Sequence, residues 1–386
     1  MPVKQDFFYE FMFPGTLAML LGLWFVLRKP RKISDIQLPI LLRESLKNSS
    51  TKPFFVLLGI GIVSSLLRPL LGGIAGMGFI LYLFSDLVII AGMYLYYSQD
   101  RRGVLYLSGA FFFRFVVAIA GGRFGELVFG LVCYFSILTV GYNVRLLNKI
   151  LIVSVGLFLI LVLQAAKGAY RTLTWYGDEE PSLTLLAKVY AEEASNPTKL
   201  FKPELLFTLT TRFNQGQLTA LVLRDVPKHR PYQNGAELLR VAAGVFVPRL
   251  FWPDKPMMGG KESIETFTIY KLDKGTSMNI APIGEAYGNF GRDGGIIFMF
   301  FYGWLIATIY KKLLDIAQNR PGMLVWLPSL MLYTVVVETD CISVFNGLIK
   351  QLFFIYFIYR LFKYLNLDLF PLASQEVIDL VMATKT

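Results

Sequence analysis

The feature that most constrains this chain is a series of apolar stretches, each long enough to cross a bilayer. A helix needs about 20 apolar residues for this, because it rises about 1.5 Å per residue and bonds its backbone polar groups internally. Charged residues make up only 17% of the sequence, whereas soluble domains carry about 25%. The pattern therefore predicts an all-α polytopic membrane protein with about nine transmembrane helices. The predicted spans are residues 9–27, 53–71, 79–97, 103–121, 124–142, 149–166, 284–310, 322–341 and 345–365.

Basic residues in the short loops predict the orientation of these spans. Cytoplasmic loops of membrane proteins carry an excess of Lys and Arg. One set of alternating loops is basic, with seven Lys and Arg in residues 28–52, and the other set holds only Arg123. We therefore expect the N-terminus outside and the C-terminus in the cytoplasm. The basic loops are 28–52, 98–102, 143–149 and 311–321, and the loops between them are 72–78, 122–123 and 342–344.

A long polar stretch separates the first six spans from the last three. Within it, residues 203–223 show an amphipathic pattern typical of a helix that lies in the membrane interface. The apolar run 236–248 is too short to span, so a re-entrant or interfacial helix is expected there. The expected parts are an N-terminal transmembrane bundle (1–166), a large outer-face loop (167–282), C-terminal transmembrane helices (283–365) and a cytoplasmic tail (366–386).

Seven charged residues inside the predicted spans fall in the outer half of the membrane. A charge at that depth needs a partner or a polar cavity. Asp86 and Arg114 each lie about seven residues from the outer end of their spans, so they are expected at equal depth and able to pair. Structural ion pairs are one interpretation of the set, and an outward-opening polar cavity in which Arg114 binds substrate is the other. The set is Arg68, Asp86, Arg114, Glu126, Glu338, Asp340 and Lys350.

The outer loop concentrates positive charge between residues 212 and 255. Seven basic side chains against three acidic ones leave a net charge of +4 in these 44 residues. Guanidinium groups match phosphate oxygens two at a time, so the pattern favours a diphosphate bound by Arg212 and Arg249. A solvated loop attracted to anionic headgroups is the alternative. Further candidate binding residues are His229, Arg230, Arg240, Asp254 and Lys255.

A second cluster lies where the seventh span begins. Glu285 stands at the outer mouth of this span, where partial burial would raise its pKa toward that of a general base, while the N–H groups of a helix start would lower it. A structural pairing with Arg292 or Arg249 is the alternative. Tyr287 and Asn289 follow on the same segment as candidate binding residues.

Four strings in these two regions carry a family resemblance. They are Arg212-Phe-Asn-Gln, Val226-Pro…Pro231-Tyr…Gly235, Pro248-Arg-Leu-Phe-Trp-Pro-Asp-Lys-Pro256 and Gly284-Glu-Ala-Tyr-Gly-Asn-Phe-Gly291. The strings resemble the oligosaccharide repeat-unit polymerases (O-antigen, Wzy-type), and they cover about 80 residues in order. Elsewhere the resemblance is one of hydropathy alone, and the predicted nine spans are fewer than the ten to fourteen common in that family.

The resemblance implies a GT-C-like glycosyltransferase at the outer face of the bacterial inner membrane. Such an enzyme joins repeat units carried on undecaprenyl diphosphate into a surface polysaccharide, an O-antigen, capsule or exopolysaccharide. Arginines would stabilise the leaving diphosphate, and Glu285 would take the proton of the acceptor hydroxyl. The implied partners are the lipid-linked oligosaccharide, membrane lipid, and the flippase and chain-length regulator of the same pathway. The alternatives are an O-antigen ligase-like glycosyltransferase and a lipid-linked glycan transporter or flippase.

No cofactor, metal or nucleic acid is expected. The chain has one histidine, and its outer loop contains no Asp-x-Asp string. Cys133 and Cys341 show neither metal-ligand spacing nor a disulfide framework. The Lys and Arg residues sit mainly between spans, which is a pattern of membrane orientation rather than of nucleic-acid binding.

Overall fold

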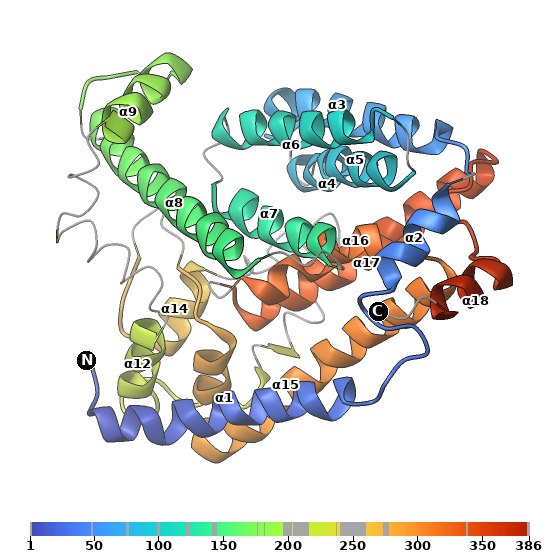
Figure 1. The fold of residues 1–386 in the computed structure, drawn as a ribbon. Coiled ribbons are helices and arrows are strands. Elements are labelled where there is room, and N and C mark those ends of the chain that lie inside the picture. Colours follow the sequence, from blue (N-terminus) through green and yellow to red (C-terminus); the bar gives the residue numbers. More distant parts are fainter. Residues whose placement is uncertain are drawn as a thin grey trace. The chain divides into compact units, whose positions relative to one another are not determined.

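Every regular element in the described part of the computed structural model is an α-helix (Figure 1). The chain forms two compact units. Unit 1 comprises Met1–Ala118, Gly125–Gly141 and Gly216–Thr386, and unit 2 comprises Ile119–Phe124 and Tyr142–Gln215. The described residues are 2–47, 49–74, 77–98, 101–120, 124–140, 145–175, 177–180, 182–195, 203, 216–236, 238–239, 260–272, 278–336 and 339–383.

Unit 2 contains α8 (Leu146–Trp175) and α9 (Leu183–Ser195), which pack through Val162, Ala165 and Tyr190. The remaining helices lie wholly or mainly in unit 1. They are α1 (Gln5–Leu27), α2 (Leu38–Leu46), α3 (Lys52–Leu71), α4 (Met77–Ser85), α5 (Leu87–Tyr97), α6 (Gly103–Ala120), α7 (Phe124–Thr139), α12 (Gly216–Asp225), α14 (Lys261–Phe267), α15 (Pro282–Asn319), α16 (Met323–Val335), α17 (Cys341–Tyr364) and α18 (Gln375–Ala383).

Several helices have the length and composition of membrane spans, which agrees with the membrane class predicted from the sequence. Each of the nine predicted spans coincides with helical residues, and α4 and α5 together form one of them. Among the described residues, five segments are long and apolar enough to cross a bilayer, and α6 and α16 contain shorter apolar helices. The five are Gln5–Leu27, Lys52–Leu71, Met77–Tyr97, Pro282–Asn319 and Cys341–Tyr364.

The helices α1 and α15 run parallel and in very close contact. The ring of Phe7 lies 6.4 Å from that of Tyr287 near their starts, and Lys311 Nζ donates to Val26 O at 3.4 Å farther along. Glycines allow this approach, because a Cβ on Gly22 would lie 2.2 Å from Phe300 O. These contacts fix the direction of α15 relative to α1.

The helices α3 and α5 pack antiparallel, as expected for successive spans. Phe54 at the start of α3 stacks on Tyr94 near the end of α5, with ring centroids 4.6 Å apart. Farther along, a Cβ on Gly61 would lie 2.7 Å from Val88 N. Tyr94 also accepts a hydrogen bond from Trp326 Nε1 at 3.1 Å, which joins α5 to α16.

Segments that the sequence places in the cytoplasm meet at one end of unit 1. Gln37 Nε2, just before α2, donates to Val381 O of α18 at 3.0 Å. Arg320 donates to Phe370 O at 2.7 Å, and Ala373 N donates to Asn319 O at 3.0 Å. Figure 1 shows α2 and α18 at this end, and α12 and α14 at the opposite end, beside the start of α1. The residues predicted as a tail therefore fold against the bundle.

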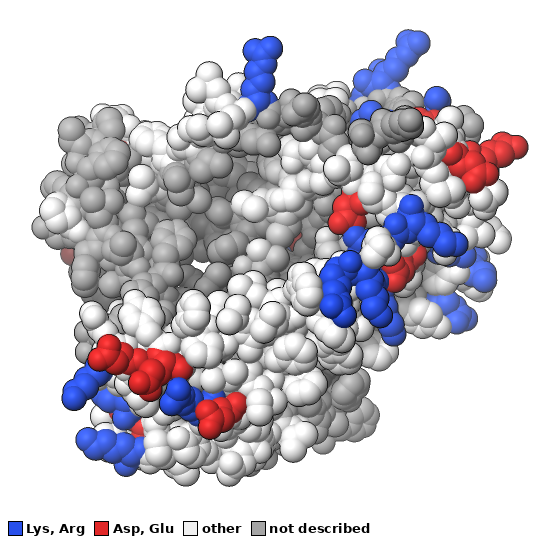
Figure 2. Space-filling model, turned by 60° about the horizontal axis from the view of Figure 1, so that its bottom comes forward, with Lys and Arg blue, Asp and Glu red and all other residues white. Residues whose placement is uncertain are grey.

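An uncharged band lies between these two ends on the face built by α1 and α15. Figure 2 shows Lys, Arg, Asp and Glu gathered at either side of a broad uncharged area. Large exposed apolar side chains of α1, including Phe13, Leu20 and Trp24, contribute to this surface. Such a surface suits contact with lipid chains.

Candidate functional site

The structure describes six of the residues that the sequence singles out for a site. His229 and Arg230 follow α12, Glu285, Tyr287 and Asn289 lie in α15, and Arg114 lies in α6. The other five lie outside the described residues, and so does most of the predicted re-entrant run 236–248. These five are Arg212, Arg240, Arg249, Asp254 and Lys255.

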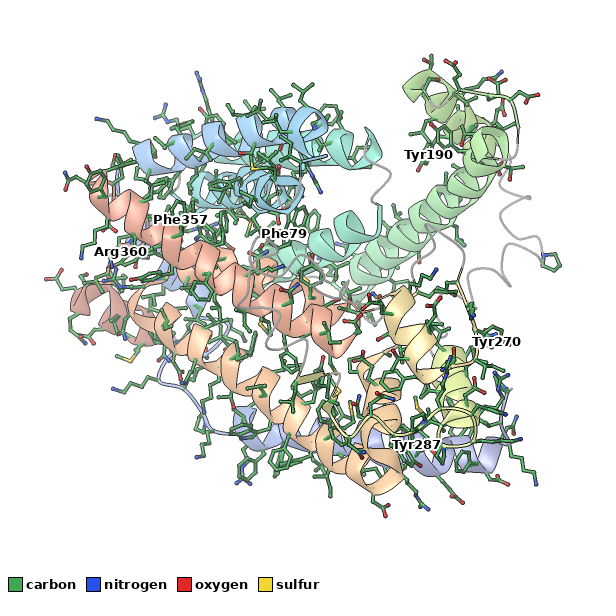
Figure 3. The ribbon with its side chains drawn as sticks, turned by 180° about the vertical axis from the view of Figure 1, so that it is seen from behind. Phe79, Tyr190, Tyr270, Tyr287, Phe357 and Arg360 are labelled. Atoms are coloured by element: carbon green, nitrogen blue, oxygen red, sulfur yellow. The ribbon has the colours of Figure 1, made fainter. Side chains whose placement is uncertain are left out.

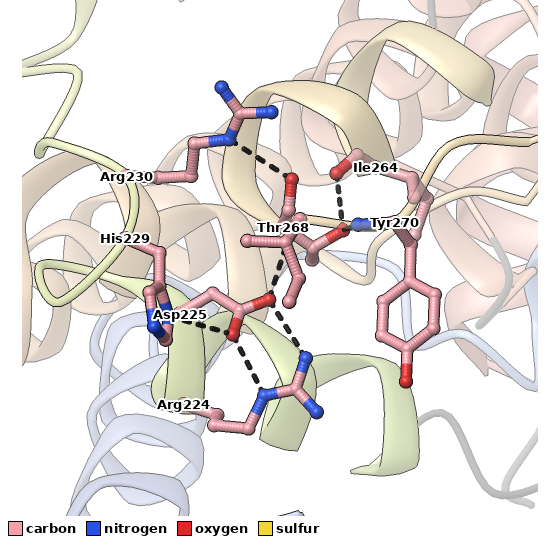
Figure 4. Close-up of polar contacts among 8 residues, drawn as sticks. Arg224, Asp225, His229, Arg230, Ile264, Thr268 and Tyr270 are labelled. Carbon is pink, nitrogen blue, oxygen red and sulfur yellow. Dashed lines mark hydrogen bonds and ion pairs between the residues drawn. The ribbon is translucent and has the colours of Figure 1, made fainter.

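Asp225 is the centre of a polar cluster at the C-terminal end of α12 (Figure 4). Its side chain is 0% exposed. Arg224 binds it with two nitrogens, Nε to Oδ1 at 2.8 Å and a terminal nitrogen to Oδ2 at 3.0 Å. Ile269 N donates to Oδ2 at 3.0 Å, which ties the segment after α14 to α12. We call Arg224, Asp225, His229, Arg230, Thr268 and Tyr270 the Asp225 cluster.

These contacts decide the charge state of the buried carboxyl. Burial alone would raise the pKa of Asp225, but the hydrogen bonds from Arg224 and Ile269 outweigh it and lower the pKa below its usual value. The same hydrogen bond raises the pKa of Arg224, whose guanidinium also lies 5.4 Å from the ring of Tyr270. A charged pair is therefore built into this end of the molecule.

His229 and Arg230, two of the binding residues predicted from the sequence, are both held by contacts within this cluster. His229 Nδ1 is 3.4 Å from Asp225 Oδ1, and its side chain is 40% exposed. Arg230 Nε donates to Thr268 O at 3.1 Å. Figure 4 shows the two terminal nitrogens of Arg230 pointing away from that contact. The cluster thus presents an exposed imidazole and a guanidinium with fixed positions.

Glu285 lies in a second cluster, in the first turn of α15. The residue is 1% exposed. Its Oε1 accepts from Ser263 Oγ of α14 at 3.1 Å, and its Oε2 accepts from Cys341 N at the start of α17 at 2.8 Å. Arg292, the structural partner expected for it, lies 3.6 Å from Glu10 of α1. Glu285 therefore joins three helices through both of its carboxylate oxygens.

Asn289 is fully buried and holds the segment after α12 against α15. Its Oδ1 accepts from Gly235 N at 3.1 Å, and its backbone oxygen accepts from Asn234 N at 2.9 Å. Its Nδ2 donates to the Glu285 backbone oxygen at 2.9 Å. These contacts join residues 234–235 to residue 289, so the outer-loop cluster and the cluster at the start of the seventh predicted span lie side by side.

Tyr287 is buried among aromatic rings at the same end. Its ring lies 5.0 Å from that of Phe11 and 6.3 Å from that of Tyr232. Figure 3 shows Tyr270 and Tyr287 at this end of unit 1 and Arg360 at the other. The expected binding roles of Tyr287 and Asn289 stay predictions, and the contacts found for both are ring contacts and hydrogen bonds within the protein.

Asp340 caps α17 beside Glu285. Its Oδ1 accepts from Ser343 N at 2.5 Å. Its Oδ2 is buried, and the backbone N–H of Gly260 also stabilises this carboxyl. The sequence marks Asp340 only as a charge within a predicted span; the Asp-x-x-Ser spacing before an apolar run is the local signal of its cap.

Arg114 forms the ion pair that its depth predicts. Its terminal nitrogen lies 2.6 Å from Asp86 Oδ1, so the predicted pairing is confirmed. Both side chains are largely buried between α6 and the junction of α4 and α5. The contact shows how the charge of Arg114 is balanced, and its role toward a substrate stays a prediction.

Comparison with known proteins places this chain in a family. Residues 34–316 match a family model described as a domain of unknown function, DUF8712. The chain belongs to this family. No curated protein and no solved structure matches it. The match includes the Asp225 cluster and Glu285, whereas Asp340 lies beyond it. Within the described residues, no group of three or more His, Cys, Asp and Glu side chains is placed to hold a metal ion.

Proposed function

We propose that this protein is a glycosyltransferase that polymerises lipid-linked oligosaccharide repeat units at the outer face of the bacterial inner membrane. The observation that carries the proposal is the Asp225 cluster. A buried carboxylate fixes Arg224 and lies beside His229, and Arg230 is held by Thr268. Fixed guanidinium groups at a membrane surface suit the diphosphate of a lipid carrier.

The packing of unit 1 supports the outer location of this cluster. Because α1 and α15 run parallel, both cross the membrane in the same direction, and the chain between them crosses an odd number of times. The five predicted spans between them satisfy this condition. The basic segments 28–52 and 311–321 lie at the end opposite the Asp225 cluster, and the positive-inside rule assigns that end to the cytoplasm.

The chemistry suits an outer location. A sugar bonded to a lipid diphosphate already has a good leaving group, so no nucleotide is needed where none is available. Charge develops on the diphosphate as the bond breaks, and positioned guanidinium groups stabilise that charge. Arg230 contributes its terminal nitrogens, and Arg212 and Arg249 are further candidates from the same loop.

The surface glycan of a deletion strain tests the proposal. Loss of a polymerase leaves single repeat units on the cell surface, whereas wild-type cells show a ladder of lengths. Loss of a ligase would leave polymer on the lipid carrier, and loss of a flippase would leave single units facing the cytoplasm. Either of these outcomes, or an unchanged ladder, contradicts the proposal.

Complementation of the deletion strain tests the cluster itself. We expect Arg230→Ala to shorten or abolish the ladder at normal protein levels, and Arg230→Lys to restore it only partly, because Lys lacks the bidentate fork. Arg360→Ala is the matched control, since Arg360 is exposed at the opposite end of unit 1 and pairs with Tyr356 of its own helix. A full ladder from Arg230→Ala would remove Arg230 from the site.

A further inference from the structure

The α1–α15 pair carries a dense group of basic side chains at the end that lies away from the Asp225 cluster. Residues 28–35 and 311–315 hold six Lys and Arg against two Asp, which leaves a net charge of +4. One of the acids, Asp35, pairs with Arg31. We call residues 28–35 and 311–315 the basic end of the α1–α15 pair.

The uncharged lengths of both helices place the basic end at the depth of lipid headgroups. Residues 11–27 of α1 and 294–310 of α15 contain no charged side chain. Each of these stretches is about 26 Å long at 1.5 Å per residue, close to the roughly 30 Å of hydrocarbon in a bilayer. The first charged residues beyond them therefore lie where the phosphates of the lipids begin.

Contacts within unit 1 hold the backbone of the basic end in place. Lys311 Nζ donates to Val26 O at 3.4 Å, and Ile33 N donates to Gln318 Oε1 at 3.4 Å. The segment that follows α1 is thus fixed along α15, while several of its cations stay open to their surroundings. The exposed cations are Arg28, Lys29, Lys32 and Lys312.

Arg28 connects the basic end to an apolar stripe of α1. Its guanidinium carbon lies 4.9 Å from the ring centroids of both Trp24 and Phe25. Leu17, Leu20 and Trp24 are exposed, and their spacing of three to four residues puts them on one helix face with Arg28. From Leu17 to Arg28 the helix rises about 16 Å, roughly half the thickness of the hydrocarbon. The stripe therefore has the length of one lipid leaflet and a cation at its end.

We propose that the basic end binds an anionic phospholipid, with the phosphate at Arg28 and Lys312 and an acyl chain along the stripe from Trp24 to Leu17. A guanidinium that stacks on rings through its face keeps the N–H groups at its edge for phosphate oxygens. Basic clusters directly beside a membrane span attract anionic lipids. The charge selects an anionic headgroup, and the apolar stripe selects a lipid over a soluble anion. The inference depends on the membrane location of the protein and not on the proposed glycosyl transfer.

Lipid binding is measured with the full-length protein purified in a nonionic detergent. Native mass spectrometry counts bound dioleoyl phosphatidylglycerol and dioleoyl phosphatidylcholine, which have identical acyl chains, and the melting temperature is followed in the same titrations. Each basic residue near an anionic lipid contributes about 5-fold in affinity, so we expect about 30-fold tighter binding of phosphatidylglycerol from the two residues. Phosphatidylglycerol should also raise the melting temperature more than phosphatidylcholine does.

Arg28→Gln combined with Lys312→Gln tests the site. Lys228→Gln combined with Arg360→Gln is the matched control, because it removes the same charge at exposed positions outside the basic end. We expect the first pair to lower the preference for phosphatidylglycerol from about 30-fold to a few-fold, and the control pair to leave it unchanged. All four side chains are exposed, so both double variants should fold, and the melting temperature without lipid checks this.

Three results would overturn the lipid site. Equal losses from the two double variants would show an effect of net charge alone. Equal binding of the two lipids by the wild type would show that the headgroup charge is not recognised. An equal rise in melting temperature from inorganic phosphate at the same concentration would show that a free anion, and not a lipid, occupies the basic end.

Discussion

Asp225 shows how one residue can organise a surface that is otherwise basic. A guanidinium, a backbone N–H and an imidazole nitrogen all lie within 3.4 Å of its oxygens. The sequence reveals the excess of positive charge in this region, but the acid appears there only as one of three negative residues. The decisive contact joins Asp225 to Ile269, 44 residues later, and no local pattern predicts it. By contrast, the pairing of Asp86 with Arg114 follows from helix geometry, because depth in a membrane helix can be counted from its end.

Removal of the Asp225 charge should destabilise this end of unit 1. Breaking a fully buried ion pair costs about 3–5 kcal/mol, and because Arg224 is partly exposed we expect about 2 kcal/mol for Asp225→Asn. Thermal unfolding of the purified protein in detergent measures the loss. Asp293→Asn, at an exposed position of α15, is the matched control. Equal melting temperatures of the two variants would contradict the role of Asp225.

Acid should remove the contribution of Asp225. Its pKa is lowered in the folded protein, so its stabilising effect is complete above the unfolded pKa of about 3.9 and is lost as the pH falls through the folded value. We expect the difference in melting temperature between wild type and Asp225→Asn to be constant near neutral pH and to shrink below about pH 4. A difference that grows on acidification would show that the sign is wrong.

At the scale of elements, long apolar runs predict helices well, whereas some short helices are not predicted from the sequence. The described residues of the nine predicted spans are mainly helical, because long apolar runs favour a structure that bonds its own backbone groups. The helices α2, α14 and α18 have seven to nine residues and lie in segments read as loop or tail. Their stability comes from tertiary contacts such as Gln37 to Val381, which local patterns do not encode.

The close contact of α1 and α15 should depend on glycine. A Cβ on Gly22 would lie 2.2 Å from Phe300 O, so Gly22→Ala has to push the helices apart. Overpacking of this kind costs about 1–3 kcal/mol, measured as a lower melting temperature in detergent. Gly59→Ala in α3 is the control, because a Cβ there would meet nothing within 4 Å. The glycine groove, which is the face of α1 around Gly22, would be unimportant for packing if both variants melted alike.

At the scale of the whole molecule, the proposed orientation of unit 1 in the membrane can be tested, because its two ends should face opposite sides. Lys228, beside the Asp225 cluster, and Lys312, near the opposite end, are both exposed. In a background with Cys133→Ser and Cys341→Ser, Lys228→Cys should react with a membrane-impermeant maleimide in intact cells with a permeabilised outer membrane. Lys312→Cys should react only after the inner membrane is opened. The reverse labelling would place the Asp225 cluster in the cytoplasm and exclude a lipid diphosphate donor at the outer face.

The pairing of α1 with α15 also bears on how the protein is made. About 250 residues separate the end of α1 from the start of α15, and ribosomes add roughly 5–20 residues per second. For some tens of seconds the glycine groove of α1 therefore has no partner helix within this chain. During that interval the insertion machinery or surrounding lipid must occupy the groove, and arrival of α15 displaces it.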